Sequence, residues 1–267
     1  MTHAAIIDAL FSLPQKGPVV QISDCIPFLE DLTPRMKLSG ITGAVLVHGN
    51  CSQCQYQWNC ADRKTHEIAS LVARHPRQLR GLAAYDSLRI GDSLRWIDEA
   101  VGTGDLAGAY VQAETCVTGL DAPRMYPLYG LCAKLRAPVV VEIANRDRWT
   151  YQRPQLEAVA ADFPELDIVL APPPASDSAT MLRLMKRFPQ LSFVLGPQEL
   201  QENDKLCEYL ELEGRERVLF RSASEEWPVA AQMARAVPLG PAARRAYLAE
   251  NASKVFGFGT EVAILSA

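Results

Sequence analysis

Charged and polar side chains follow the apolar runs of this sequence, at the points where strands are predicted to end. In the segment VLFRS (218–222), three apolar residues lead directly to Arg221 and Ser222. A guanidinium stays protonated and offers five donors, which suit a carboxylate or a phosphate. A buried strand that ends in arginine therefore predicts either a site for an anion or a salt bridge that neutralises the charge.

Other runs end in groups that can transfer protons or hold a charged molecule. Carboxylates and imidazoles are common general acids and bases. The predicted catalytic groups are Asp24, Glu142 and His48, and the predicted substrate-binding groups are Arg221, Arg146, Glu114 and Ser222. Alternatively, Arg221 and Glu142 form a buried salt bridge across the strands, because buried charges need partners whether or not they act on substrate.

A second group of candidate residues lies in the segment HGNCSQCQYQWNC (48–60). Thiolates and imidazole bind zinc tetrahedrally, and a Cys-x2-Cys pair is the usual first half of such a site. Cys51, Cys54 and Cys60 could thus hold a structural zinc ion, with His48 or His66 as the fourth ligand. A second Cys-x2-Cys pair is missing, so simple buried thiols or a disulfide are alternatives. We expect no other cofactor.

Eight short apolar runs alternate with segments of helical period along the whole chain. The runs cover 18–23, 43–49, 80–86, 107–114, 138–144, 167–173, 191–196 and 217–222. Most are apolar on both faces, which is typical of parallel strands covered by helices. Eight such units predict one domain over 1–267, a (β/α)8 TIM barrel with a short N-terminal helix at 3–12. A doubly wound open sheet is the alternative, but the turn DCIPF lacks its glycines.

Composition narrows the classes of partner. The net charge is −4 and no block of Lys and Arg is present, which argues against nucleic acid and anionic membranes. No apolar run approaches the roughly 18 residues of a membrane span. Seven cysteines in 267 residues are an odd number and do not suggest a disulfide framework. We therefore expect a cytoplasmic protein that binds a small molecule.

The order and spacing of several segments carry a family resemblance. They are GITGAVLVHGN (40–50), ARHPRQLRGLAAYD (73–86), RAPVVVEIAN (136–145), VAADFPELDIVLAPPP (159–174), RVLFRSASEEWP (217–228) and ENASKVFGF (250–258). In this order they resemble the amidohydrolase-related TIM-barrel family, on the branch that contains aminocarboxymuconate-semialdehyde decarboxylase. The resemblance implies an active site at the carboxyl ends of the strands, and it suggests a homodimer.

The positions that resemble the family's metal ligands hold other residues. Many members carry a His-x-His pair after strand one, further histidines in strands five and six, and an aspartate after strand eight. The matching positions here are Ser23 and Cys25, then Glu142, Pro172 and Ala223. A metal would supply a hydroxide nucleophile. Its loss implies a metal-independent hydrolase or carboxy-lyase for a small carboxylated or lactone-type molecule, or a non-catalytic pseudoenzyme that binds a small ligand or a protein partner.

Overall fold

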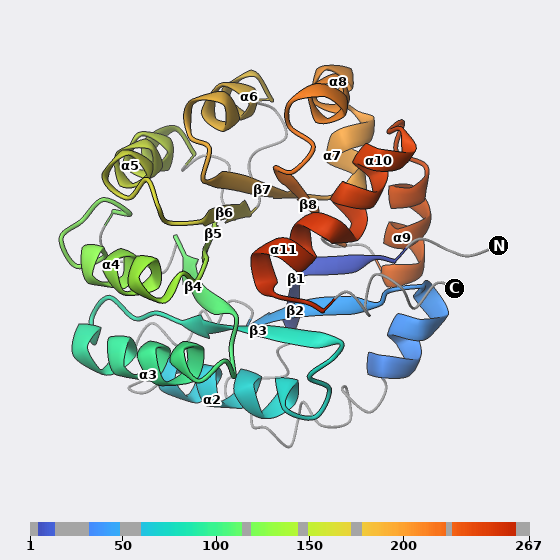
Figure 1. Cartoon of the computed structure of the whole chain (residues 1–267). Coiled ribbons are helices and arrows are strands. Elements are labelled where there is room, and N and C mark those ends of the chain that lie inside the picture. The colour runs from blue at the N-terminus through green and yellow to red at the C-terminus, as the bar shows by residue number, and fades with distance from the viewer. Residues whose placement is uncertain are drawn as a thin grey trace.

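Eight parallel strands and a ring of helices form a (β/α)8 barrel, as the sequence predicts (Figure 1). The computed structural model describes residues 5–13, 32–48, 60–113, 119–143, 149–171, 178–222 and 226–259. Each strand from β1 to β7 pairs in parallel with the next one along the chain. The strands are β1 (Ile7–Leu13), β2 (Gly43–His48), β3 (Leu79–Ala84), β4 (Gly108–Gln112), β5 (Val139–Glu142), β6 (Ile168–Ala171), β7 (Leu191–Leu195) and β8 (Val218–Phe220).

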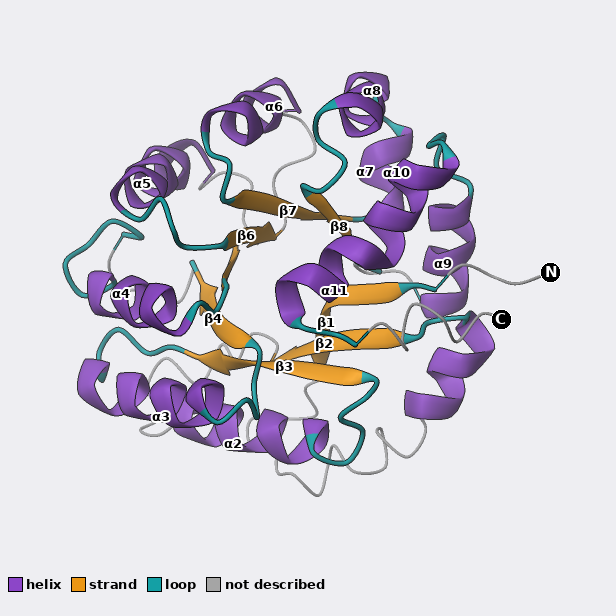
Figure 2. Ribbon diagram, in the orientation of Figure 1, coloured by secondary structure: helices purple, strands orange, loops and turns teal. Residues whose placement is uncertain are grey.

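The helices lie outside the strands and cover the barrel (Figure 2). Residues 32–39 form the first described helix. The others are α2 (Cys60–Val72), α3 (Ile90–Gly102), α4 (Tyr126–Leu135), α5 (Trp149–Asp162), α6 (Ser178–Arg187), α7 (Pro197–Gln201), α8 (Asp204–Leu212), α9 (Trp227–Arg235), α10 (Pro241–Arg245) and α11 (Asn251–Phe256), with a π-helical segment (Ala246–Glu250) before α11. No helix among these residues is long and apolar enough to cross a bilayer.

The helix expected at 3–12 is wrong, because Ile7–Leu13 is the first strand of the barrel. This strand is buried almost along its whole length, and a short apolar run of this kind does not separate strand from helix by its period. The run at 18–23, predicted as strand one, lies outside the described residues. The register of β1 and β2 shifts between Asp8 and Phe11, which marks a β-bulge.

Two sets of buried side chains separate the inside of the barrel from its outside. The outer set packs the strands against the surrounding helices and includes Leu46, Val141 and Phe220. Alternate strand residues fill the interior, and residues from the chain's C-terminal part cover one end of it. This inner set includes Ile7, Ala9, Leu10, Val45, Val47, Leu82, Tyr110, Val140, Val169, Ala171, Val194, Leu219, Ala249, Ala252, Phe256 and Phe258.

Three helices differ from the sequence pattern. Proline suits the first turn of a helix, so the sequence predicts a helix that begins at Pro154; α5 begins earlier, at Trp149, and Pro154 lies inside it. The pattern over 198–210 predicts one helix, whereas the chain forms α7 and α8. Asn203 separates them, and its side chain caps α8 by accepting a hydrogen bond from the Leu206 amide at 3.2 Å. Helix α9 was not predicted, although its first residue, Trp227, contacts the strands.

Candidate active site

The inward-facing residues at the carboxyl ends of β4, β5 and β8 form a polar layer. Gln112 is the register partner of Glu142, and each lies two residues beyond an interior residue, Tyr110 or Val140. Arg221 likewise lies two residues beyond the interior Leu219. Because side chains alternate along a strand, Gln112 and Glu142 face the barrel interior, and Arg221, the first residue after β8, has the same place in the alternation as Leu219. The layer combines an amide, a carboxylate and a guanidinium above an apolar interior.

Glu142 is held from below by a tyrosine. The hydroxyl of Tyr110, a buried residue of β4, donates a hydrogen bond to Oε2 of Glu142. Glu142 itself is only partly buried, so it stays within reach of a molecule in the mouth of the barrel. A carboxylate fixed in this way can accept a proton from water or from a substrate hydroxyl.

Arg221 pairs with Glu199 of α7, not with Glu142 as predicted. Nη2 of Arg221 lies 3.6 Å from Oε1 of Glu199, which is longer than a hydrogen bond. Oε2 of Glu199 accepts a hydrogen bond from the Gly196 amide at 2.5 Å. Helix α7 follows β7 directly, so Glu199 arrives beside the end of β8, while Glu142 belongs to a strand farther around the barrel.

The guanidinium of Arg221 has unused donors. Only 14% of the side chain is exposed, and within the described part of the chain it donates no hydrogen bond; its Nε is fully buried without an acceptor. A buried donor without a partner is costly, and such a group in a native structure calls for an explanation. An anion between the strand ends would supply the missing acceptors.

His48 faces away from this layer. It is the register partner of Leu13, which belongs to the outer set, and it alternates with the interior Val47. Its Nε2 lies 3.0 Å from Oε2 of Glu67 on α2, close enough for an ion pair but not aligned for a hydrogen bond. Both side chains are only 5% exposed. The imidazole therefore packs between strand and helix, on the opposite face from Glu142.

Ser222 binds a residue that was not predicted from the sequence, Asp8. Its hydroxyl donates to Oδ2 of Asp8 at 2.6 Å, and its amide donates to Oδ1 at 3.3 Å. Both residues are buried, so Ser222 has no donor left for a substrate. A single acid inside the apolar run IIDALF was the available signal for Asp8, because a charge in a buried strand requires partners.

Several predicted residues cannot be placed. Asp24, Glu114 and Arg146 lie outside the described residues, as do Cys51 and Cys54. Cys60 begins α2, but its side chain is not described. Within the described ranges, no group of three or more His, Cys, Asp or Glu side chains is placed to hold a metal ion.

The first strand also corrects the comparison with the family's His-x-His pair. Ser23 and Cys25 do not end strand one, since β1 ends at Leu13. Beyond the bulge, the interior residue is Leu10, so alternation turns Ser12 toward the same side. The inward-facing pair at this end of β1 is thus Leu10 and Ser12. Leucine offers no ligand atom for a metal.

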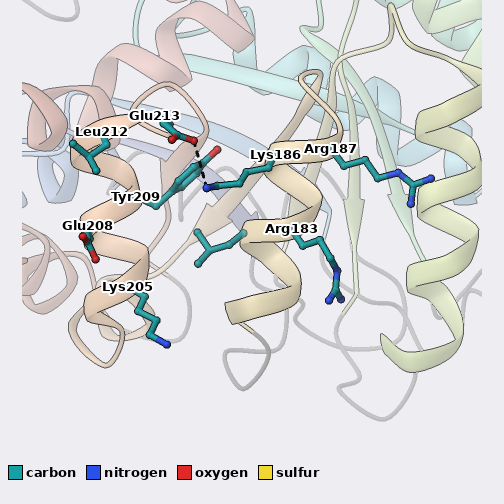
Figure 3. A pocket seen from close by; sticks show the side chains of 9 residues that line it. Arg183, Lys186, Arg187, Lys205, Glu208, Tyr209, Leu212 and Glu213 are labelled. Carbon is teal, nitrogen blue, oxygen red and sulfur yellow. Dashed lines mark ion pairs between the residues drawn. The ribbon is translucent and has the colours of Figure 1, made fainter.

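A groove of about 750 Å³ lies elsewhere, between α6 and α8 on the outer ring of helices (Figure 3). Lys186 points across it toward Glu213, with Nζ 3.5 Å from Oε2, and lies over the ring of Tyr209. The residues that line the groove include none of the residues predicted from the strand ends. It is therefore separate from the candidate active site.

Comparison with known proteins agrees with this architecture. The sequence model of the amidohydrolase family described as "Amidohydrolase" matches residues 24–258. No curated protein matches the chain significantly in sequence.

Solved structures match over nearly the whole chain. An uncharacterised TIM-barrel protein from Bordetella bronchiseptica has a TM-score of 0.73 at 16% identity, covering 95% of this chain and 99% of that one. A 2,6-dihydroxybenzoate decarboxylase in complex with 2,6-dihydroxybenzoate has a TM-score of 0.71 at 17% identity, covering 96% and 100%. A Pseudomonas putida protein named "Putative 2-Pyrone-4,6-Dicarboxylic Acid Hydrolase" has a TM-score of 0.64 at 17% identity, covering 97% and 98%. The chain therefore belongs to the amidohydrolase family.

Proposed function

We propose that this chain binds a small carboxylated or lactone-type molecule in the mouth of the barrel and acts on it as a hydrolase or carboxy-lyase. The observation that carries the proposal is Arg221, whose partly enclosed guanidinium lies at the carboxyl end of β8 with unused donors. Arginine binds a carboxylate through two parallel hydrogen bonds. A carboxylate is therefore the anion that fits best.

The similar structures support the same class of molecule. Their names mention 2,6-dihydroxybenzoate and 2-pyrone-4,6-dicarboxylic acid, which carry carboxylates on a ring. At 16–17% identity these proteins share the fold with this chain, and the substrate class is carried over only as part of the proposal. The polar layer of Gln112, Glu142 and Arg221 offers groups that such a ring would need.

For a lactone, the proposed reaction is hydrolysis with Glu142 as general base and Arg221 as the group that binds the carboxylate. Glu142, oriented by Tyr110, removes a proton from water as the water oxygen bonds to the lactone carbonyl carbon. The ring C–O bond then breaks, and the proton passes from Glu142 to the departing oxygen. Arg221 holds a carboxylate on the same molecule and so fixes the carbonyl near Glu142.

The catalytic metal of the family does not fit the described inner residues. Leu10 and Ser12 occupy β1, Ala171 ends β6, and the guanidinium of Arg221 adds a positive charge beside β8. A divalent ion needs several anionic or neutral donor ligands in one place. We therefore propose a mechanism without this metal, in which Asp24 is a second candidate base and Glu114 and Arg146 are further substrate-binding residues.

We also propose a structural zinc ion, a homodimer and a cytoplasmic location, as the sequence predicts. A structural zinc ion would be held by Cys51, Cys54 and Cys60, and elemental mass spectrometry of protein purified without chelators would detect it. About one zinc per chain, lost in a Cys51→Ser, Cys54→Ser variant, is the expected result. The homodimer is implied by the family resemblance and the cytoplasmic location by the composition, and light scattering would test the dimer.

A non-catalytic barrel is the second candidate, and one contact favours it. Glu199 already lies 3.6 Å from Arg221 and partly neutralises its charge without any ligand. A pseudoenzyme would retain this pair as part of its structure and would bind a small ligand or a protein partner without turnover.

The test combines binding and turnover. Isothermal titration with 2,6-dihydroxybenzoate and 2-pyrone-4,6-dicarboxylate would measure affinity, and liquid chromatography would measure product. We expect binding that falls about 100-fold in Arg221→Met and turnover that is lost in Glu142→Gln. Binding without turnover in the wild type would favour the pseudoenzyme. No binding of either acid would contradict both the carboxylate ligand and the role of Arg221.

A further inference from the structure

The seam between β1 and β8 lacks the backbone pairing that joins the other neighbouring strands. The two strands lie side by side and complete the barrel (Figure 1). Every other neighbouring pair in the described barrel has a parallel ladder, but none joins β8 to β1. A closed barrel leaves no free strand edge, so other contacts must hold these two edges together.

The carboxylate of Asp8 bridges this seam. From the β8 side, Oδ2 accepts hydrogen bonds from Ser222 Oγ at 2.6 Å and from Nε1 of Trp227 at 2.8 Å, and Oδ1 accepts one from the Ser222 amide at 3.3 Å. All three residues are buried. Asp8 therefore links β1 both to Ser222, two residues beyond the end of β8, and to the start of α9.

The same carboxylate stabilises the bulge in β1. Asp8 pairs with Ala44 and Phe11 with Leu46, so three residue steps on β1 match two on β2. The amide of Leu10, inside the bulge, donates to Oδ1 of Asp8 at 3.3 Å. The extra residue turns Leu10 inward and leaves Phe11 outside, with its ring 4.5 Å from that of Trp227.

We infer that the side chain of Asp8 closes the barrel in place of a β8–β1 ladder and thereby positions Arg221. Arg221 directly precedes Ser222, and its own amide donates to the Leu195 carbonyl of β7 at 3.2 Å. The end of β8 is thus fixed to β7 through Arg221 and to β1 through Ser222. Asp8 is a positioning residue, and only this second part of the inference rests on the proposed function.

A matched control exists at the other end of the same strand. Asn251 of α11 is buried, and its Nδ2 donates to the carbonyls of Arg215 at 2.8 Å and Val218 at 2.7 Å. Asn251→Ala removes one buried and one partly buried hydrogen bond near the start of β8 but leaves the carboxyl end of the strand held by Asp8. Asp8→Asn and Ser222→Ala weaken the carboxyl end instead.

Hydrogen exchange followed by mass spectrometry tests the closing role without any ligand. We expect Asp8→Asn and Ser222→Ala to accelerate exchange of the Arg221 and Ser222 amides about tenfold or more under native conditions, relative to Asn251→Ala. Unchanged exchange at these two amides would overturn the inference. Should Asp8→Asn fail to fold, Ser222→Ala, which removes only one hydroxyl, decides the question.

Titration with 2,6-dihydroxybenzoate tests the positioning role. Ser222→Ala should weaken binding about tenfold, whereas Asn251→Ala should leave the affinity unchanged even at an equal loss of thermal stability. Equal losses of affinity in the two variants would mean that Asp8 and Ser222 stabilise the fold but do not position Arg221. If the wild type binds no carboxylate, the proposed function fails, while the exchange experiment still decides whether Asp8 closes the barrel.

Discussion

Asp8 is a fully buried acid and Arg221 is a partly enclosed base near the end of β8, and their surroundings are opposite. Asp8 accepts four hydrogen bonds, all from neutral donors, and has no exposed surface. Arg221 precedes the residue that binds Asp8, yet its guanidinium has one distant carboxylate and a buried Nε without an acceptor. Ser222, which donates to the satisfied charge, and Arg221, which carries the unsatisfied one, are adjacent in sequence.

This difference indicates that Asp8 contributes to the stability of the fold and Arg221 to the binding of a ligand. A fully satisfied buried network fixes the fold, and each of its members is needed to keep the others paired. An unsatisfied charge at a strand end lowers the stability of the empty protein, and proteins commonly accept such a loss where a ligand binds. Asp8 is therefore expected to govern unfolding, and Arg221 is expected to govern affinity.

Replacing Asp8 should give the largest effect on stability. In Asp8→Ala, the amides of Leu10 and Ser222 and the indole of Trp227 lose their acceptor inside the protein. We expect the free energy of unfolding in urea to fall by roughly 3–5 kcal/mol. Lys254→Ala is the control, because its pair with Glu216 is exposed and should contribute less than about 1 kcal/mol. Similar losses in the two variants would remove the contrast on which this interpretation depends.

Arg221 should behave in the opposite way. Arg221→Met removes a buried charge that lacks hydrogen bonds, so we expect the free energy of unfolding to change by less than about 1 kcal/mol or to rise. Binding of 2,6-dihydroxybenzoate should fall about 100-fold in the same variant. A stability loss comparable to that of Asp8→Ala would show that Arg221 is structural. Arg221→Met combined with Glu199→Gln controls for the carboxylate left without its partner.

The pH dependence of stability gives a smaller and more specific signal. Burial raises the pKa of Asp8 above its usual 3.8, against the lowering effect of its hydrogen bonds to Ser222, Trp227 and Leu10. The folded state therefore binds the proton more tightly than the unfolded state does. The stability that Asp8 contributes is greatest below pH 3.8, declines as pH rises toward the higher native pKa, and is constant above it.

The measurement is the difference between wild type and Asp8→Asn in free energy of unfolding, taken from about pH 3 to pH 7. Because asparagine does not titrate, this difference should shrink as pH rises through the lower part of the range. A difference that grows with pH would mean that the four donors outweigh burial and lower the pKa of Asp8 instead.

The comparison also shows which features could be read from the sequence. The barrel, seven of its eight strands and the placement of Glu142 and Arg221 at strand ends follow from apolar runs with polar endings. The first strand was missed because IIDALFSL is short and apolar enough to suit a helix. Without that strand, neither Asp8 nor the seam could be predicted.

The contacts that a side chain makes were harder to predict from the sequence than its place at the end of a strand. His48 follows an apolar run as Glu142 does, but it alternates with the interior residue Val47 and so faces outward toward Glu67. Because this run is apolar on both faces, the sequence does not show which alternate residues face the interior. The pairing of Arg221 with Glu199 instead of Glu142 depends in the same way on how far α7 reaches over the strand ends.

The smallest expected effect is on the chemical labelling of Cys132, a buried residue for which we propose no function. Its thiol lies inside α4 against the outer apolar core, and burial raises its pKa to about 12. A thiol in that state is neutral at pH 8 and unreactive, unlike the thiolate that a catalytic cysteine requires. Iodoacetamide at pH 8 should therefore leave Cys132 unlabelled in the native protein and modify it only in urea, as peptide mass spectrometry would show. Asp8→Asn should leave this protection intact if the seam opens locally, whereas rapid labelling of Cys132 in that variant would mean that loss of the Asp8 contacts loosens the whole barrel.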